Sequence, residues 1–264
     1  MPIFQVDAFT DQLFGGNPAA VVPLTAWPDA SVMQQIAMEN NLAETAFYCP
    51  VPNTRDQFDI RWFTPALEID LCGHATLAAA WVIRHIFGYT EPLVRFHSKS
   101  GALTVGTDGS RGVLNFPARM PDLLLDYPEQ VLKGLRIAQP VAVYKSRDYL
   151  VELESEKELL ALQPDFTLLG ELDVIGFIAT APGKEADFVS RFFAPRAGIN
   201  EDPVTGSAHS TLIPFWAEKL GKKKMLAKQV SKRGGTLWCE MLDNNRVHMA
   251  GECVLYMKGE IYLP

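Results

Sequence analysis

The chain has 264 residues and a formal net charge of −7 at neutral pH. Nucleic-acid recognition needs concentrated positive charge, so this balance argues against a nucleic-acid partner. Hydrophobic residues make up 48% of the chain and charged residues 21%. We therefore expect a folded protein with a large core and not a disordered chain.

No membrane partner or secretory signal is predicted. The longest apolar run, residues 71–83, is interrupted by Gly73 and His74 and is shorter than the roughly 20 residues that a bilayer requires. Residues 1–7 lack a basic segment followed by an apolar one, so we expect a cytoplasmic location. The cysteines are scattered without a C-x-x-C pair, which favours reduced thiols at Cys49, Cys72, Cys239 and Cys253.

The first half of the chain alternates short strand patterns with two helical patterns. The first helix is predicted from Asp29 or Ser31 to about Asn40, and the second from Gly73 to near Gly88. The second is apolar on all sides from Leu77 to Ile83, so a curled, barrel-like sheet must enclose it. The strand patterns cover residues 3–9, 19–22, 42–48, 58–64, 93–96, 103–105 and 113–116.

The second half repeats this pattern, with helices predicted over residues 185–192 and 206–220. Pro214 removes one hydrogen bond inside the second of these and predicts a kink. The strand patterns cover residues 141–143, 149–152, 175–179, 236–240, 247–249 and 253–256.

Two stretches look like copies of one another. The segment 61–65 (RWFTP) precedes Gly73-His74-Ala75, and the segment 191–195 (RFFAP) precedes Gly206-Ser207-Ala208. Such self-similarity indicates a duplicated chain, although ordinary turn chemistry met twice by chance is the alternative. We predict two pseudo-symmetric α+β domains, residues 1–118 and 119–264, with a final strand that can pack on the first.

The candidate chemistry lies beside the two glycine-led helix starts. A helix N-terminus presents backbone N–H donors, so Gly73 and Gly206 are placed to hold a substrate carboxylate. His74, Asp202 and the lone acid Glu44 could then move a proton. Each residue also has a purely structural interpretation. His74 can be a helix-start residue that bonds its own turn, Asp202 a turn residue before Pro203, and Glu44 a surface residue at a corner.

Standard cofactor and metal motifs are missing. The chain has no G-x-G-x-x-G, P-loop or H-E-x-x-H sequence, and His209 breaks the G-x-S-x-G pattern around Ser207. Cys72, His74, His85 and His97 lack the spacing of a zinc ligand set. We expect neither a cofactor nor a metal.

Together these segments resemble the phenazine-biosynthesis PhzF-like isomerase family, relatives of diaminopimelate epimerase. The resemblance spans essentially the whole chain. The matching motifs are Phe9-Thr10, Gly16-Asn17-Pro18-Ala19-Ala20-Val21, Asn41-Leu42-Ala43-Glu44-Thr45-Ala46-Phe47, Phe63-Thr64-Pro65, Leu71-Cys72-Gly73-His74-Ala75-Thr76-Leu77 and Glu201-Asp202-Pro203-Val204-Thr205-Gly206-Ser207-Ala208.

The resemblance implies the diaminopimelate epimerase-like fold, with a curved sheet around a central helix in each domain and a cleft between them. It also implies that Glu44 is the catalytic acid–base and that His74 and Asp202 act beside it. The substrate-binding residues would be Asn17, Gly73, Gly206 and Ser207, with the backbone amides near Gly73 and Gly206 holding the substrate carboxylate. A homodimer is a further expectation from the resemblance.

The reaction type stays open at this point. A cofactor-independent hydrogen shift is the main hypothesis. The alternatives are an amino-acid racemase or epimerase and a non-catalytic binding protein of the same fold. The epimerase relatives use one cysteine at each helix start, and here Cys72 matches the first but Thr205 stands at the second.

Overall fold

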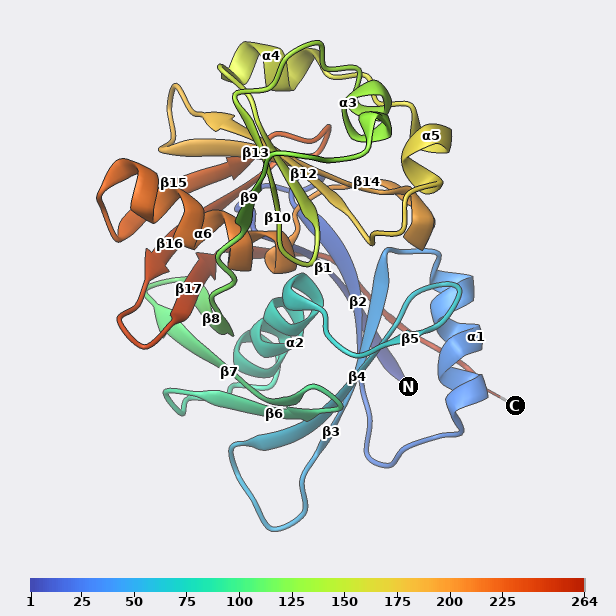
Figure 1. Ribbon diagram of the computed structural model, residues 1–264. Coiled ribbons are helices and arrows are strands. Elements are labelled where there is room, and N and C mark those ends of the chain that lie inside the picture. Colours follow the sequence, from blue (N-terminus) through green and yellow to red (C-terminus); the bar gives the residue numbers. More distant parts are fainter. Residues whose placement is uncertain (264) are drawn as a thin grey trace. The chain divides into compact units, whose positions relative to one another are not determined.

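The computed structural model describes residues 1–263, which form two compact units (Figure 1). Unit 1 comprises residues 1–116 and the segment from His248 onward, and unit 2 comprises residues 117–247. The C-terminal segment belongs to unit 1 because its strand pairs antiparallel with the N-terminal strand. The division predicted at residue 118 allowed for this strand without requiring it.

The sheet of unit 1 is mostly antiparallel, with parallel pairs at β2–β3 and β4–β6. Its strands are β1 (Pro2–Ala8), β2 (Asn17–Pro23), β3 (Glu44–Pro50), β4 (Gln57–Phe63), β5 (Glu68–Ile69), β6 (Val94–Ser98), β7 (Gly101–Asp108), β8 (Arg111–Pro117) and β18 (Cys253–Glu260).

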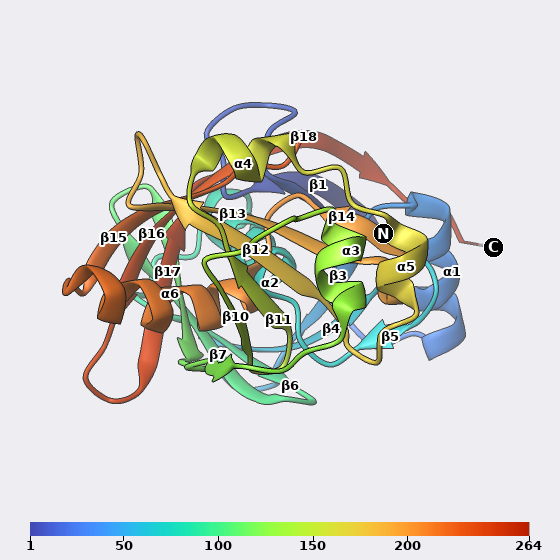
Figure 2. The same cartoon turned by 45° about the horizontal axis from the view of Figure 1, so that its top comes forward.

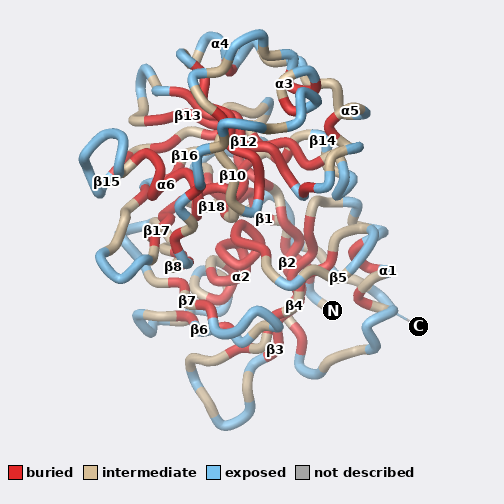
Figure 3. The backbone as a smooth tube through the Cα atoms, in the orientation of Figure 1, coloured by how far each residue is buried: buried red, intermediate tan, exposed pale blue. Residues whose placement is uncertain are grey.

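Helix α2 (Gly73–His85) is the core of unit 1, and Figure 3 shows it buried along almost its whole length. It contacts β1, β2, β3, β7 and β18, so strands surround it. Helix α1 (Ala30–Asn40) packs outside this barrel through Met33, Ile36 and Ala37, which share one helical face.

Unit 2 has the same plan, with parallel pairs at β11–β12 and β13–β15. Its strands are β9 (Asp122–Leu124), β10 (Ala142–Lys145), β11 (Tyr149–Glu152), β12 (Phe177–Pro182), β13 (Phe188–Ala194), β14 (Ile199–Asp202), β15 (Lys224–Gln229) and β16 (Gly235–Met241), and β17 (Arg246–Gly251) follows across the boundary.

The buried helix of unit 2 is α6 (Gly206–Leu220), which packs on β15 and β16. Three short helices lie outside the sheet: α3 (Glu129–Leu135), α4 (Glu156–Ala161) and α5 (Phe166–Gly170). Figure 2 shows α3 beside α5, and both bury leucines in a second core with β10 to β13. A single 3-10 turn, η1 (Pro195–Ala197), joins β13 to β14.

One expectation for unit 2 was wrong. Residues 185–192 form no helix, because Phe188 begins strand β13, which lies between β12 and β15 with its aromatic and β-branched side chains buried. Helix α6 runs across Pro214 as one element. The short helices α3, α4 and α5 carried too little periodic pattern to be predicted.

Strand registers align the two units residue by residue. Thr45 pairs with Phe63 in unit 1, and Phe177 pairs with Phe193 in unit 2. Arg61 on β4 donates two hydrogen bonds to Glu68, of 2.8 and 2.9 Å. Arg191 on β13 donates two to Glu201, of 2.7 and 2.9 Å. The repeat is therefore structural, and the predicted α+β fold of two pseudo-symmetric barrels is confirmed.

Within residues 1–263, no helix combines the length and apolar character needed to cross a bilayer.

Candidate active site

Four predicted residues of unit 1 meet at the N-terminal end of α2. Glu44 is the first residue of β3, Asn17 the first of β2, and Gly73 and His74 open α2. His74 Nε2 lies 3.1 Å from Glu44 Oε2, and His74 Nδ1 lies 3.2 Å from the Asn17 side-chain nitrogen. The structure thus brings all four together around the imidazole ring.

The turn before β2 fixes Asn17. Gly16 has a φ of 58°, and a Cβ atom there would lie 2.1 Å from the carbonyl oxygen of Ala8. Only glycine therefore fits this close approach. Asn17 follows directly and is fully buried beside His74.

His74 and Glu44 are nearly enclosed, with exposed fractions of 4% and 8%. Their contact is an ion pair that lacks hydrogen-bond alignment, so within residues 1–263 neither His74 Nε2 nor Glu44 Oε2 has a hydrogen-bond partner. Buried polar atoms normally find partners. These two atoms retain the capacity to bind or exchange a proton with a substrate.

Two opposing influences act on the pKa of His74. Burial lowers it, while Cys72 and the Glu44 carboxylate raise it, and the net result is a pKa well above the usual 6.5. Burial and the nearby Glu44 raise the pKa of the Cys72 thiol. A protonated Cys72 thiol carries no charge, so the Glu44 carboxylate is the group beside the ring that favours the imidazolium form of His74.

Helix α2 begins without a side-chain cap. Cys72 is the N-cap residue, and the first N–H bonded to a carbonyl of the helix is that of Thr76, which bonds Cys72 O at 3.3 Å. The N–H groups of Gly73 and His74 precede this bond, so they are available at the positive end of the helix. An anion would be stabilised there.

Glu44, Cys72 and His74 also place their ligand atoms within 4.8 Å of one another. However, Glu44 approaches Nε2 of the ring and Cys72 approaches Nδ1, at 3.5 Å. One ion binds one imidazole nitrogen, so these two side chains flank the ring from opposite sides and do not converge on one metal position. The geometry suits proton transfer better than chelation.

In unit 2, Asp202 sits in a rigid hydrogen-bonded corner. Thr205 Oγ1 donates to Asp202 Oδ2 at 2.5 Å, and Gln229 Nε2 donates to the Asp202 carbonyl oxygen at 2.7 Å. Gln229 Oε1 also accepts from the Thr205 N–H at 2.8 Å. Thr205 and Gln229 were not predicted as site residues. Thr205 was named only as the residue that replaces a cysteine.

The predicted residues Gly206 and Ser207 open α6, which like α2 has no side-chain cap. Arg147 was not predicted as a site residue, and its Nη2 donates to Ser207 Oγ at 3.1 Å. Asp148, 1% exposed, accepts from Arg147 Nε at 3.3 Å and holds the guanidinium. A basic residue in the short turn between the patterns at 141–143 and 149–152 was the available signal.

The structure therefore groups the predicted residues into two sets. Glu44, His74, Asn17 and Gly73 contact one another in unit 1, and Asp202, Gly206 and Ser207 lie at the start of α6 in unit 2. Each set sits where a β-strand of the repeat leads into the buried helix.

A family model described as phenazine biosynthesis-like protein, PhzC-PhzF, matches residues 6–259. The chain belongs to this family. A protein of Pseudomonas aeruginosa named an uncharacterized isomerase is 48% identical over 263 residues, covering 100% of this chain and 99% of that protein.

Solved structures agree. The crystal structure of a PhzF family phenazine biosynthesis protein from Enterococcus faecalis superposes with a TM-score of 0.94 at 44% identity and covers 99% of both chains. A probable proline racemase from Agrobacterium radiobacter shares the fold with a TM-score of 0.64 at 9% identity, over 100% of this chain and 93% of that one. This PhzF family member is an isomerase with an epimerase-like fold.

Proposed function

We propose that this protein is a cofactor-independent isomerase that moves a proton on a small carboxylate-bearing substrate, with Glu44 as the general acid and base. The observation that carries the proposal is the buried Glu44–His74 pair, in which neither facing atom has a hydrogen-bond partner within residues 1–263. A carboxylate held beside a fixed cation in a dry site is well suited to proton transfer.

The first step would remove a proton from carbon. Glu44 takes a proton from the carbon next to the substrate carboxylate, and negative charge develops on the carboxylate oxygens. The N–H groups of Gly73 and His74 stabilise this charge because they lie at the positive end of α2. Protonated Glu44 then returns the proton to another carbon of the same molecule, so the reaction consumes no co-substrate.

His74 and Asn17 position this base. In a neutral ring whose Nδ1 is unprotonated, the Asn17 amide donates to Nδ1 and the proton on Nε2 faces Glu44. In a protonated ring both nitrogens carry a proton, and the one on Nε2 again faces Glu44. In either state the imidazole edge holds Glu44 Oε2 in place. Asp202, Gly206 and Ser207, with Arg147, are proposed as the contribution of unit 2 to substrate binding and catalysis.

A racemase or epimerase is the second candidate, since Cys72 stands at the N-cap of α2 as the epimerase relatives require. Thr205 occupies the equivalent N-cap of α6. A hydroxyl is far less acidic than a thiol, so the two-thiol mechanism lacks its second base. Binding without turnover is the third candidate.

Deuterium exchange tests these candidates. The protein is incubated in D2O with a panel of α-amino acids and unsaturated carboxylic acids, and NMR follows deuterium at each carbon. A hydrogen shift places the label at a new carbon, racemisation labels the α-carbon and gives the second enantiomer, and binding alone gives saturation transfer without label.

The matched variants are Glu44→Gln and Glu39→Gln, since Glu39 is an exposed acid on α1. We expect Glu44→Gln to slow exchange by about 100-fold or more and Glu39→Gln to leave it unchanged, because a positioned general base contributes about 10²–10⁴-fold. Exchange at the wild-type rate in Glu44→Gln would contradict the proposed role of Glu44.

A further inference from the structure

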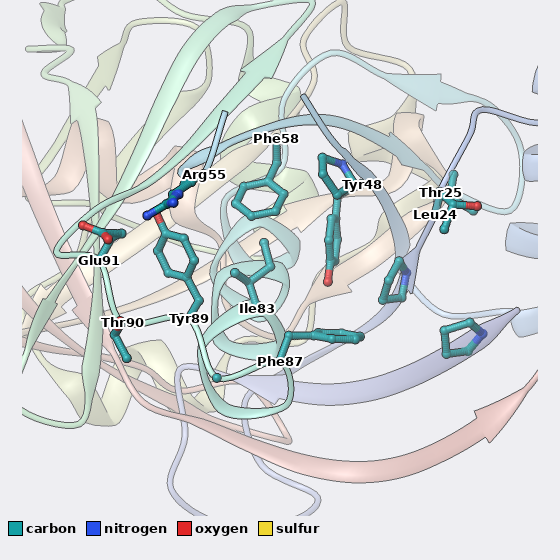
Figure 4. Close-up of a pocket in the computed structure, with 14 residues that line it drawn as sticks. Leu24, Thr25, Tyr48, Arg55, Phe58, Ile83, Phe87, Tyr89, Thr90 and Glu91 are labelled. Atoms are coloured by element: carbon teal, nitrogen blue, oxygen red, sulfur yellow. The ribbon is translucent and has the colours of Figure 1, made fainter. Parts of the chain in front are cut away.

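Unit 1 contains a cavity of about 590 Å³ at the end of α2 opposite to His74 (Figure 4). Ile83 and Phe87 line it from the C-terminal end of that helix, and Tyr48 lines it from β3. Ile83 is nine residues beyond His74, which is about 13 Å along a helix. The cavity is therefore separate from the Glu44–His74 cluster.

The cavity wall is mainly aromatic. Phe58 packs edge-on against Tyr48 with ring centroids 5.6 Å apart and against Tyr89 at 6.0 Å, and Phe87 closes another side. Figure 4 shows these rings around an open space. A cavity of this size and lining matches the concave, mostly apolar sites that take small molecules, roughly 300–1,000 Å³.

One polar group points into this apolar space. Tyr48 is 4% exposed, and within residues 1–263 its hydroxyl makes no hydrogen bond to another protein group. The oxygen is not sealed inside the protein and is accessible from the cavity. In Figure 4 the hydroxyl is directed toward the space beside Phe87 and Ile83. Burial raises the pKa of Tyr48, so the group stays protonated and can donate.

The equivalent place in unit 2 carries a different pair of side chains. Tyr48 on β3 pairs with Pro23 on the parallel neighbour and Ile60 on the antiparallel one. Thr180 on β12 pairs in the same way with Glu152 and Ser190. Tyr48 and Thr180 are therefore equivalent positions of the two units. Counting from the helix-opening glycines equates Ile83 with Trp216.

In unit 2 the space is occupied by the indole ring. Trp216 Nε1 donates to Thr180 Oγ1 at 2.9 Å, and the ring stacks on Phe188 with centroids 5.7 Å apart. In unit 1 the sizes are exchanged: Ile83 replaces the indole ring, and the larger Tyr48 packs on Phe58 with ring centroids 5.6 Å apart. The hydroxyl of Tyr48, unlike Trp216 Nε1, has no protein acceptor, so a ligand oxygen at the cavity can accept from it.

We propose that this cavity binds an uncharged aromatic molecule that carries a carbonyl or ether oxygen, with the oxygen accepting from the Tyr48 hydroxyl and the ring lying against Ile83, Phe58 and Phe87. The rim carries one cation and one anion, Arg55 and Glu91, so it favours no net charge. The proposal does not depend on the proton-transfer reaction.

The test uses the full chain and the fluorescent naphthalene ketone prodan, which is uncharged and has one carbonyl acceptor. Its emission moves to shorter wavelength in an apolar site and to longer wavelength when the carbonyl accepts a hydrogen bond. We expect saturable binding, and we expect Tyr48→Phe to weaken it about fivefold with a further shift to shorter wavelength, because one hydrogen bond contributes about 1 kcal/mol.

Two blocking variants decide the location. Ile83→Trp places in unit 1 the ring that Trp216 supplies in unit 2, and Thr25→Trp adds bulk at the exposed rim, where misfolding is not a concern. Both are expected to weaken prodan binding at least about tenfold, since a filled cavity offers no apolar area to the ligand. Thermal melting confirms that each variant is folded.

Binding that stays within twofold of wild type in both blocking variants overturns the proposal. It is also overturned if the wild-type protein binds no prodan. A dimer in sedimentation that Thr25→Trp dissociates would then show that a second copy covers the cavity. Deuterium exchange by the Glu44 site is measured in parallel, and its failure leaves the prodan result unaffected.

Discussion

The two units share a scaffold but differ at the point where β3 or β12 begins. Glu44 in unit 1 corresponds to Gly176 in unit 2, where a Cβ atom would lie 2.2 Å from the ring of Phe192. Unit 2 therefore has no room for an acid at this position. Packing alone can therefore confine a buried acid to one copy of a duplicated fold.

The helix starts differ in a related way. The N-cap carbonyl of α2 accepts from Thr76 Oγ1 at 2.5 Å, and that of α6 accepts from His209 Nδ1 at 2.8 Å. His74 and Ser207 are likewise equivalent positions. Unit 1 places its histidine beside a carboxylate, and unit 2 places its histidine beneath the helix start, fully buried.

The largest expected effect comes from giving unit 1 the residue of unit 2. His74→Ser removes the cation that faces Glu44, so we predict a loss of about 100–1,000-fold in kcat for solvent exchange. Ser207→His is the reciprocal variant, and it should not restore activity to His74→Ser because unit 2 has no acid at residue 176. Restored turnover in the double variant would contradict the claim that only unit 1 can pair a histidine with an acid.

His209 should make folding sensitive to acid. Burial lowers the pKa of His209 to about 4, against a usual 6.5, while the Thr205 carbonyl opposes this shift. As pH falls from 6.5 toward 4 the unfolded chain binds a proton that the folded one does not, so the free energy of unfolding decreases.

The decrease should reach about 2–3 kcal/mol at about pH 4.5. Urea unfolding at neutral pH and at this lower pH measures it, and His209→Gln should lose this part of the pH dependence. An identical dependence in wild type and variant would show that the buried imidazole contributes nothing.

The equivalent arginines Arg61 and Arg191 test whether the same motif contributes equally to the free energy of unfolding in both units. Arg191, with a side chain 13% exposed, also donates to the carbonyl oxygens of Leu159 and Leu162, whereas Arg61 is 27% exposed and Glu68 has a second partner in Lys99. We predict that Arg191→Lys costs about 2–3 kcal/mol of unfolding free energy and Arg61→Lys about 1 kcal/mol or less.

Chemical denaturation of both variants measures this difference, and equal costs would mean that the additional carbonyl contacts do not matter. Arg61→Lys should also raise the pKa of Glu68, which Arg61 chiefly and Lys99 in addition lower to about 2.

The smallest effect is expected at Cys72. If Glu44 alone moves the proton, Cys72→Ala should change exchange rates by less than about threefold, whereas loss of a catalytic base costs about 10²–10⁴-fold. A loss in the larger range, together with production of a second enantiomer, would favour the racemase mechanism.

The duplicated motifs were enough to predict the fold. The repeat of Arg-aromatic-Phe-x-Pro followed by glycine, together with a helix apolar on all sides, required two sheets that each enclose a helix. The prediction failed where pattern was weak, as at residues 185–192. The charged residues at the start of this segment suit a helix as well as a strand, and its pairing with two distant strands decided its structure.

The sequence by itself determined the duplicated architecture, the family and the residue types at each helix start, because these depend on periodicity and on local motifs. The tertiary structure was needed to show that Glu44 faces His74, that Arg147 reaches Ser207, and that Tyr48 and Ile83 line a cavity in unit 1. These features depend on contacts between residues far apart in the chain, and side-chain volume and strand register set such contacts.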